Sequence, residues 1–240
     1  MNQLVYQSSI PSETKEKFIS AYISQQHCNG NGCGGAVWLE KREYWLQGKV
    51  VGIRYFEEDG TLAIETPLKD DKYHGTYYRF YETGTLEYAL PYLHGKQHGQ
   101  SCQWTPGGLL MGTSSFSHGT GYDLWWHPFM ELDKPGFYLA EILPYKDGVP
   151  HGVEWWLNED QQSVYIERYY REGNLHGIER WWDVDGHLRE DYPNFYIHNN
   201  IVSQEEYISA THNDPTLPKF VENDQLPQRT FPDVIAEKFG

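Results

Sequence analysis

The sequence predicts a mainly β protein: an elongated antiparallel β-meander of stacked hairpins with a short helix at each flank. Two observations carry this prediction. Glycine-bearing turns recur along the chain, each followed by about six aromatic and β-branched residues, a second turn and another strand-like run. Aromatic residues also make up 16% of the 240 residues, an apolar content that intrinsically disordered chains lack.

The repeats are anchored on the last glycine of each turn, and the intervals between anchors range from 22 to 31 residues. The longest interval contains an insertion at Met130 to Gly136, whose role the sequence leaves open. A single hairpin cannot bury its own apolar face, so we expect the repeats to pair edge to edge. The anchor glycines are Gly52, Gly75, Gly99, Gly121, Gly152 and Gly177.

The two faces of the predicted sheet differ in composition. Fourteen of eighteen residues at odd offsets (+1, +3, +5) from the anchors are apolar or aromatic, against six of eighteen at even offsets (+2, +4, +6). Since successive strand residues point to opposite sides, we expect the odd face to be covered and the even face to meet water.

The flanks differ from the repeats. Phe18, Ile19, Tyr22 and Ile23 have helical spacing and predict a helix within 11–25, followed by a glycine-rich linker. Ser203 and Glu206 form a capping-box pattern that begins a second helix. An acidic, proline-containing tail ends in an apolar cluster that can dock: Phe231, Val234, Ile235 and Phe239. The predicted divisions are 1–36, a repeat domain over 37–202, and a helix and tail over 203–240.

Charge and cysteine content limit the partners and the compartment. The net charge of −15 disfavours nucleic acid and anionic membranes and favours a basic protein partner. Three cysteines and the lack of a signal-like apolar run predict a cytoplasmic protein. Nothing in the sequence predicts a cofactor.

Histidine precedes glycine six times, at His74, His94, His98, His118, His151 and His176. Imidazole is a common metal ligand, but these residues lie in separate repeats and need not converge. We interpret them as turn residues that tolerate positive φ. His27, Cys28 and Cys33 offer three soft ligands where structural zinc normally takes four, so we interpret that segment as a linker. We predict no metal site.

Catalytic patterns are weak. His151 with Glu154, and His176 with Glu179, could serve as acid and base, but in a turn followed by a strand their side chains should point in different directions. Nucleophile-elbow, phosphate-loop, dinucleotide-binding and zinc-protease motifs do not occur. We therefore predict a non-enzymatic protein with no catalytic residues.

The even face carries an anomaly, because four of its six +4 positions are aromatic. One interpretation is that these rings shield one another within the sheet. The other is a partner-binding surface of aromatic anchors with an acidic border. The candidate partner-binding residues are Phe56, Trp125, Trp156, Trp181, Asp123, Glu154, Glu179 and Asp183.

Two segments carry a family resemblance: YKDGVPHG followed by VEWWLN, and YREGNLHG followed by IERWWDVDGHL. They resemble the MORN-repeat variant family, and the resemblance extends over about residues 43–207. It implies hairpin sheets that act as scaffolds or interaction modules, and many bacterial variants are antitoxin-like without a shared catalytic residue.

We therefore expect a non-enzymatic protein that binds a basic protein partner, with an antitoxin or immunity-type inhibitor as the sharpest version. One alternative is a structural scaffold or self-assembling adaptor. The other is a carbohydrate-binding aromatic surface.

Overall fold

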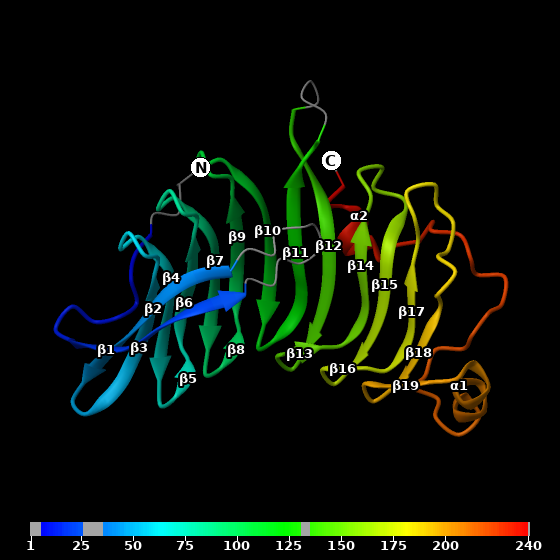
Figure 1. Cartoon of the computed structure of the whole chain (residues 1–240), viewed down its shortest axis with the longest axis horizontal. Coiled ribbons are helices and arrows are strands. Elements are labelled where there is room, and N and C mark those ends of the chain that lie inside the picture. The colour runs from blue at the N-terminus through cyan, green and yellow to red at the C-terminus, as the bar shows by residue number, and fades with distance from the viewer. Residues whose placement is uncertain (1–5, 26–35, 131–134, 240) are drawn as a thin grey trace. The chain divides into compact units, whose positions relative to one another are not determined.

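The computed structural model describes residues 6–25, 36–130 and 135–239, and for 22–25 and 36–38 only the backbone. The predicted mainly β, antiparallel meander is confirmed, and the described helices are two short ones (Figure 1). The chain forms two compact units, 1–118 and 119–240, so the predicted repeat domain extends over both.

In the first unit each strand pairs antiparallel with its neighbours along the chain. Its strands are β1 (Lys15–Gln25), β2 (Ala36–Leu46), β3 (Lys49–Phe56), β4 (Leu62–Lys69), β5 (Lys72–Tyr73), β6 (Gly75–Phe80), β7 (Leu86–Leu93), β8 (Lys96–Gln97), β9 (Gly99–Trp104) and β10 (Leu110–Ser117).

The second unit continues the hairpin pattern and ends in the two helices. Its elements are β11 (Thr120–Pro128), β12 (Phe137–Lys146), β13 (Val149–Pro150), β14 (Gly152–Leu157), β15 (Val164–Arg171), β16 (Asn174–Leu175), β17 (Gly177–Trp181), β18 (Asn194–Ile197), β19 (Asn200–Val202), α1 (Gln204–Thr211) and α2 (Asp233–Ala236).

The predicted N-terminal helix is wrong, because residues 15–25 form β1. This strand pairs with β2 from Lys15 opposite Trp45 to Gln25 opposite Ala36. A short isolated helix is marginal without a surface on which to bury its apolar side, and here Phe18 is 58% exposed. The cross-strand hydrogen bonds to β2 therefore determine the structure of residues 15–25, although their apolar residues have helical spacing. The linker residues His27, Cys28 and Cys33 lie outside the described residues.

The predicted C-terminal helix is confirmed as α1. The Ser203 hydroxyl accepts a hydrogen bond from the Glu206 backbone N–H, and the Glu206 carboxylate accepts one from the Ser203 backbone N–H. Tyr207 of this helix is fully buried against Phe195 of β18, with ring centres 5.0 Å apart. The helix therefore packs on the end of the repeat sheet.

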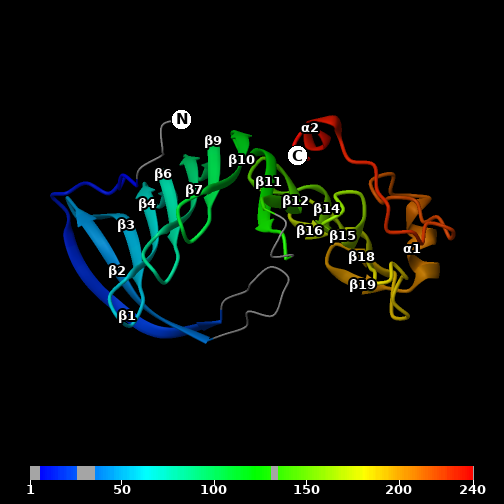
Figure 2. The same ribbon diagram turned by 90° about the horizontal axis from the view of Figure 1, so that it is seen from above.

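In the second unit the odd face is covered, as expected. The C-terminal segment lies along one side of β14–β17 (Figure 2). Phe231 stacks edge-on against Trp155 of β14, and the Trp182 indole N–H donates to the Gln225 carbonyl oxygen at 2.6 Å. The predicted docking of the apolar tail cluster is confirmed for Phe231 and Ile235, which are buried, whereas Val234 is exposed.

The N-terminal segment packs on the first unit. Tyr6 contacts Tyr78 and Phe80 edge-on, with ring centres 5.0 and 5.2 Å away. The Ile10 side chain fills the place that a Cβ on Gly52 would need, since its Cδ1 lies 2.2 Å from that position. Residues 6–10 therefore cover the face that carries Tyr78.

The expected face assignment is wrong for the first repeat. Arg54 lies opposite Glu65, and Glu65 lies opposite Tyr78, so the even-offset Arg54 shares a face with the odd-offset Tyr78. In the repeats anchored on Gly75, Gly99, Gly152 and Gly177 two extra residues bulge between the turn and the long strand pairing, whereas β3 has one extra residue, Val51. A bulge shorter by one residue reverses which side chains face inward.

Candidate functional site

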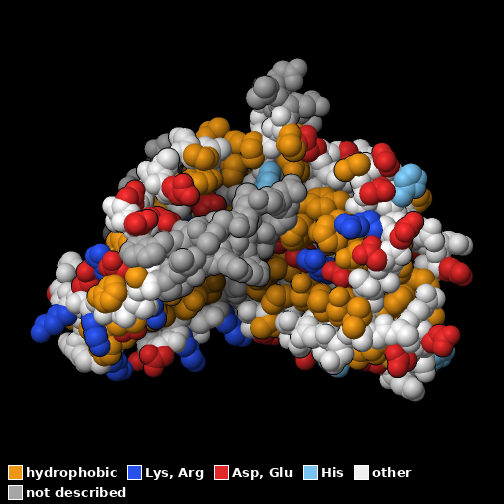
Figure 3. Space-filling view, viewed as in Figure 1, with side chains coloured by type: hydrophobic (Ala, Val, Ile, Leu, Met, Phe, Trp, Pro, Cys, Tyr) orange, Lys and Arg blue, Asp and Glu red, His pale blue; other side chains and the backbone are white. Residues whose placement is uncertain are grey.

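Three of the predicted aromatic residues lie in one row on the even face of the second unit. The cross-strand pairs run from Trp125 to Glu141, from Glu141 to Trp156, and from Trp156 through Ile166 to Trp181. Figure 3 looks onto this side, where hydrophobic side chains gather over β11–β18 with a few charged groups among them. We call this surface the tryptophan face.

Carboxylates lie within the tryptophan face rather than around it. Glu154 and Glu179 are 5% and 7% exposed, and both contact Arg168. The Arg168 Nε donates to the Glu179 carboxylate at 2.7 Å, and its Nη1 lies 3.4 Å from a Glu154 oxygen. The expected acidic border is therefore a buried ion-paired row, because Glu154 and Glu179 flank one guanidinium.

Trp156 is a buried anchor of this network and not an exposed ridge. It is 9% exposed, its indole N–H donates to Glu154 at 3.1 Å, and the Arg168 guanidinium lies 5.5 Å from its ring centre. Cation–π contacts and cross-strand pairing of this kind stabilise a sheet. The shielding interpretation therefore accounts for Trp156 itself.

Trp181 is half-buried. Arg189 lies 4.6 Å from its ring centre, and Tyr192 stacks edge-on at 5.9 Å. Trp125 and Asp123 lie on β11 and are also half-buried, with Asp123 opposite Leu143. The part of the face that meets solvent therefore includes Trp125 and Trp181.

Tyrosines line the same face. Burial is the main cause that raises the pKa of Tyr145, Tyr165 and Tyr170 to about 12, and nearby carboxylates add smaller contributions. Glu141 and Glu154 contribute to all three shifts. The negative potential that disfavours a tyrosinate here favours a cation.

Phe56 and Asp183 do not join the tryptophan face. Phe56 belongs to the first unit, where the one-residue bulge puts it on the side of Arg54, and Arg42 lies 4.4 Å from its ring centre. Asp183 is in an exposed turn, where its carboxylate accepts the N–H groups of Asp185 and His187. These hydrogen bonds within the turn, and not a place on the tryptophan face, account for an acidic residue at position 183.

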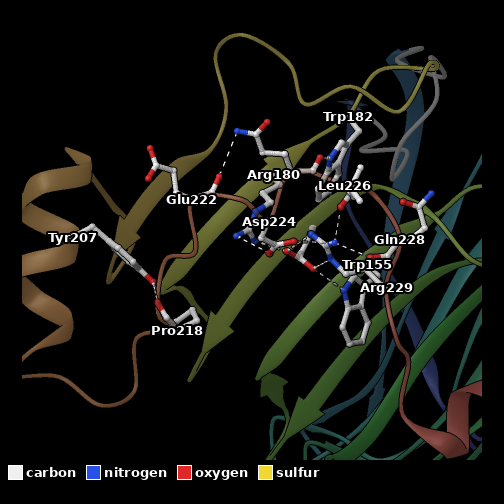
Figure 4. Close-up of polar contacts among 12 residues, drawn as sticks. Trp155, Arg180, Trp182, Tyr207, Pro218, Glu222, Asp224, Leu226, Gln228 and Arg229 are labelled. Carbon is white, nitrogen blue, oxygen red and sulfur yellow. Dashed lines mark hydrogen bonds and ion pairs between the residues drawn. The ribbon is translucent and has the colours of Figure 1, made fainter.

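The opposite face holds an ionic network that the sequence analysis missed (Figure 4). Glu167 of β15 is 3% exposed and accepts from Arg180 of β17 and from Arg229 of the C-terminal segment, both at 2.6 Å. Asp224 lies 3.0 Å from Arg180 and 3.4 Å from Arg229. The sequence held one signal of this network, because Arg180 is one of the few polar residues at an odd offset from an anchor glycine.

The histidines before the anchor glycines are hydrogen-bond acceptors. His176 is 2% exposed, and its Nδ1 accepts from the His198 backbone N–H at 3.3 Å. The explanation by positive φ holds for His94 and His118, whose φ values are 52° and 51°, but it is wrong for the four histidines before the anchor glycines, which are His74, His98, His151 and His176. The expectation that these histidines need not converge is also wrong, since the ring centres of His98 and His118 are 4.4 Å apart and those of His74 and His94 are 4.9 Å apart.

His176, His198 and Asp214 bring potential metal-ligand atoms within 4.8 Å of one another. The His176 Nε2 lies 3.0 Å from the Thr216 hydroxyl, which donates to Asp214. Because Nδ1 already accepts an N–H, the neutral ring carries its proton on Nε2, the nitrogen that faces this cluster. A metal ion bound to the His176 Nε2 would shift that proton to Nδ1, where it would face the backbone N–H of His198. The three residues of this cluster therefore do not fit a metal site.

The two acid–base pairs that the sequence analysis considered and disfavoured are oriented apart. The His151 Nδ1 accepts from the Glu172 backbone N–H at 3.4 Å, while Glu154 contacts Trp156 and Arg168. His176 bonds toward Thr216, while Glu179 bonds to Arg168. Neither pair forms a hydrogen-bonded dyad.

Comparison with protein-family models, curated proteins and solved structures finds no match to this chain. The resemblance to MORN-repeat variants therefore stays a prediction based on the quoted segments. Within the described residues, neither helix has the length and apolar character needed to cross a membrane.

Proposed function

We propose that this protein is a non-enzymatic binding module that uses the tryptophan face to hold a protein partner with basic side chains. The observation that carries the proposal is the row of Trp125, Trp156 and Trp181 alternating with Glu141 and Ile166 across five strands. The opposite face is covered by the chain's own C-terminal segment, so the two sides of this unit differ in their use.

The chemistry of the face suits a protein interface. Rigid aromatic rings supply contact area at low entropic cost, and tyrosine and tryptophan are enriched among the residues that dominate binding energy. The buried ion pairs of Arg168 hold the rings in place before binding. A net charge of −15 would accelerate encounter with a basic partner.

The most specific form of the proposal is an antitoxin or immunity-type inhibitor, which would act by covering the functional surface of a basic effector. It is supported by the acidic charge and by the resemblance of the repeats to MORN variants. Occlusion of this kind requires binding energy and no catalytic group.

The test is capture of partners from the native lysate with the tagged protein, followed by calorimetry with each purified partner. Trp181→Ala is the informative variant because Trp181 is half-buried, whereas truncation of Trp156 would open a cavity in the sheet face. Loss of an interface anchor weakens binding by at least about 2 kcal/mol, which corresponds to roughly 30-fold in Kd.

Tyr73→Ala is the matched control, since Tyr73 is an aromatic residue of the first unit that is 43% exposed. Equal affinity of wild type and Trp181→Ala for every partner would reject the tryptophan face as the binding surface. Binding of a glycan array, lost in the same variant, would favour the carbohydrate alternative. Concentration-dependent oligomers without a partner would favour the self-assembling scaffold.

A further inference from the structure

The position immediately before each anchor glycine carries a second pattern. In five of six repeats its side chain accepts a hydrogen bond from a backbone N–H in the turn of the next repeat. The acceptors and donors are His74 with His94 (3.4 Å), His98 with His118 (3.2 Å), Thr120 with Asp147 (3.3 Å), His151 with Glu172 (3.4 Å) and His176 with His198 (3.3 Å).

Each donor residue has the same backbone conformation, with φ between 48° and 57°. In three of the histidine contacts a backbone bond lies beside the side-chain bond. Gly95, Gly173 and Asn199, each next to a donor residue, donate to the carbonyl oxygens of Tyr73, Pro150 and Leu175 at 2.8 to 2.9 Å. We call each side-chain contact, with its backbone bond where present, a turn latch.

Four turn latches depend on a neutral imidazole. A histidine Nδ1 accepts a hydrogen bond only while it carries no proton, and protonation places two N–H groups face to face. In three latches a second imidazole lies against the first with its ring plane tilted, and the ring centres are 4.9 Å apart for His74 and His94, 4.4 Å for His98 and His118, and 4.3 Å for His176 and His198. Charging both rings of such a pair adds repulsion.

We propose that these four histidines form an acid-sensitive device, in which protonation between about pH 7 and pH 5 opens the turn latches while the strand pairing persists. The Thr120 latch is the built-in exception, because a hydroxyl accepts at either pH. The first repeat has Val51 at this position and still pairs β2 with β3, so the latch is not required for the strands to form.

The charged neighbours act in opposing directions. His74 faces His94, Lys69 and Asp70, and its pKa is lowered by burial first and then by His94 and Lys69, while Asp70 acts against them. For His176, burial and then His198 lower the pKa, Arg171 adds to this effect, and Asp214 opposes it. His98 faces His118, and His151 faces the backbone of Glu172.

For His74 and His176 the direction of the pH effect follows from these shifts. A histidine whose pKa is lower in the folded state contributes stability that is complete above about pH 6.5, its unfolded value. That stability is lost as the pH falls through the folded pKa. In all four histidine latches the geometry gives the same direction, because an Nδ1 that carries a proton cannot accept the backbone N–H.

Amide hydrogen exchange, resolved by NMR at pH 7 and pH 5, tests the proposal. After correction for intrinsic exchange rates, we expect the amides of His94, His118, Glu172 and His198 to lose about fivefold protection at pH 5, which is the loss of one hydrogen bond of about 1 kcal/mol. The Asp147 amide, bonded to Thr120, should keep its protection. Equal loss at all five amides would mean general acid unfolding and would overturn the proposal.

A variant isolates one latch. His98→Thr copies the natural acceptor at position 120, so the His118 amide should stay protected at both pH values, while the His94 and His198 amides remain acid-sensitive. His187→Thr is the control, because that exposed histidine is in no latch. An acid-sensitive His118 amide in His98→Thr would show that the imidazole is not the switch.

Discussion

Glu65 and Glu167 occupy equivalent places in their units, each ten residues before an anchor glycine. Both are buried, and both fasten a segment from outside the repeats. Glu65 accepts from the hydroxyls of Tyr6 and Ser8 at 2.8 and 2.9 Å, and Glu167 accepts from Arg229. A carboxylate at this position therefore holds a covering segment onto the sheet.

Replacing Glu167 should be costly because it would leave the 3%-exposed Arg180 without its main partner. We expect Glu167→Ala to lower the free energy of unfolding by about 3–5 kcal/mol, the usual effect of breaking a buried ion pair. Urea denaturation at pH 7 measures it. The control is Asp70→Asn, which removes the charge of an exposed pair with Lys49 and should change the free energy of unfolding far less. Similar losses in both variants would contradict this account.

Among the elements, the hairpin strands could be predicted because glycine turns fix where each strand starts and ends. The predicted assignment of inward and outward faces was correct where two residues bulge and wrong where only Val51 bulges. The turn segments WLQGKVVG and YKDGVPHG have equal lengths, so the spacing of the sequence could not reveal this difference in the bulge. The N-terminal strand was missed because its partner lies about 10–30 residues away, whereas a helical spacing is local.

The α1 cap was predictable because both of its bonds join residues three apart. We expect Ser203→Ala to destabilise the protein by about 1 kcal/mol, since it removes one bond of the capping box. Ser209→Ala, an exposed site inside the same helix, is the control and should be near neutral. Chemical denaturation of the two variants under identical conditions compares them, and an equal effect would mean that the cap contributes nothing.

Of the predicted binding residues, alternation and anchor spacing located Trp125, Trp156 and Trp181 on one face. They could not show that Arg168 lies between Glu154 and Glu179, because that contact depends on which strands are neighbours. The C-terminal network was likewise invisible, since Arg229 lies 62 residues from Glu167. Long-range ion pairs are set by tertiary structure and not by local pattern.

The chain as a whole divides into two compact units, and the second contains its own covering segment. Ile178, Phe195, Tyr207 and Leu217 form a buried cluster within it. In repeat proteins, stability is approximately the sum of the repeats and their nearest-neighbour contacts, so shortened arrays can still fold. We therefore expect a fragment of residues 119–240 to fold by itself.

This fragment should show a β-type circular dichroism spectrum and one cooperative thermal transition. Introducing Glu167→Ala into it should lower its midpoint, because the ionic network that fastens the C-terminal segment lies entirely within these residues. Asp185→Ala, in an exposed turn of the same fragment, is the control. A disordered spectrum would show that the second unit needs the first in order to fold, and would contradict this expectation.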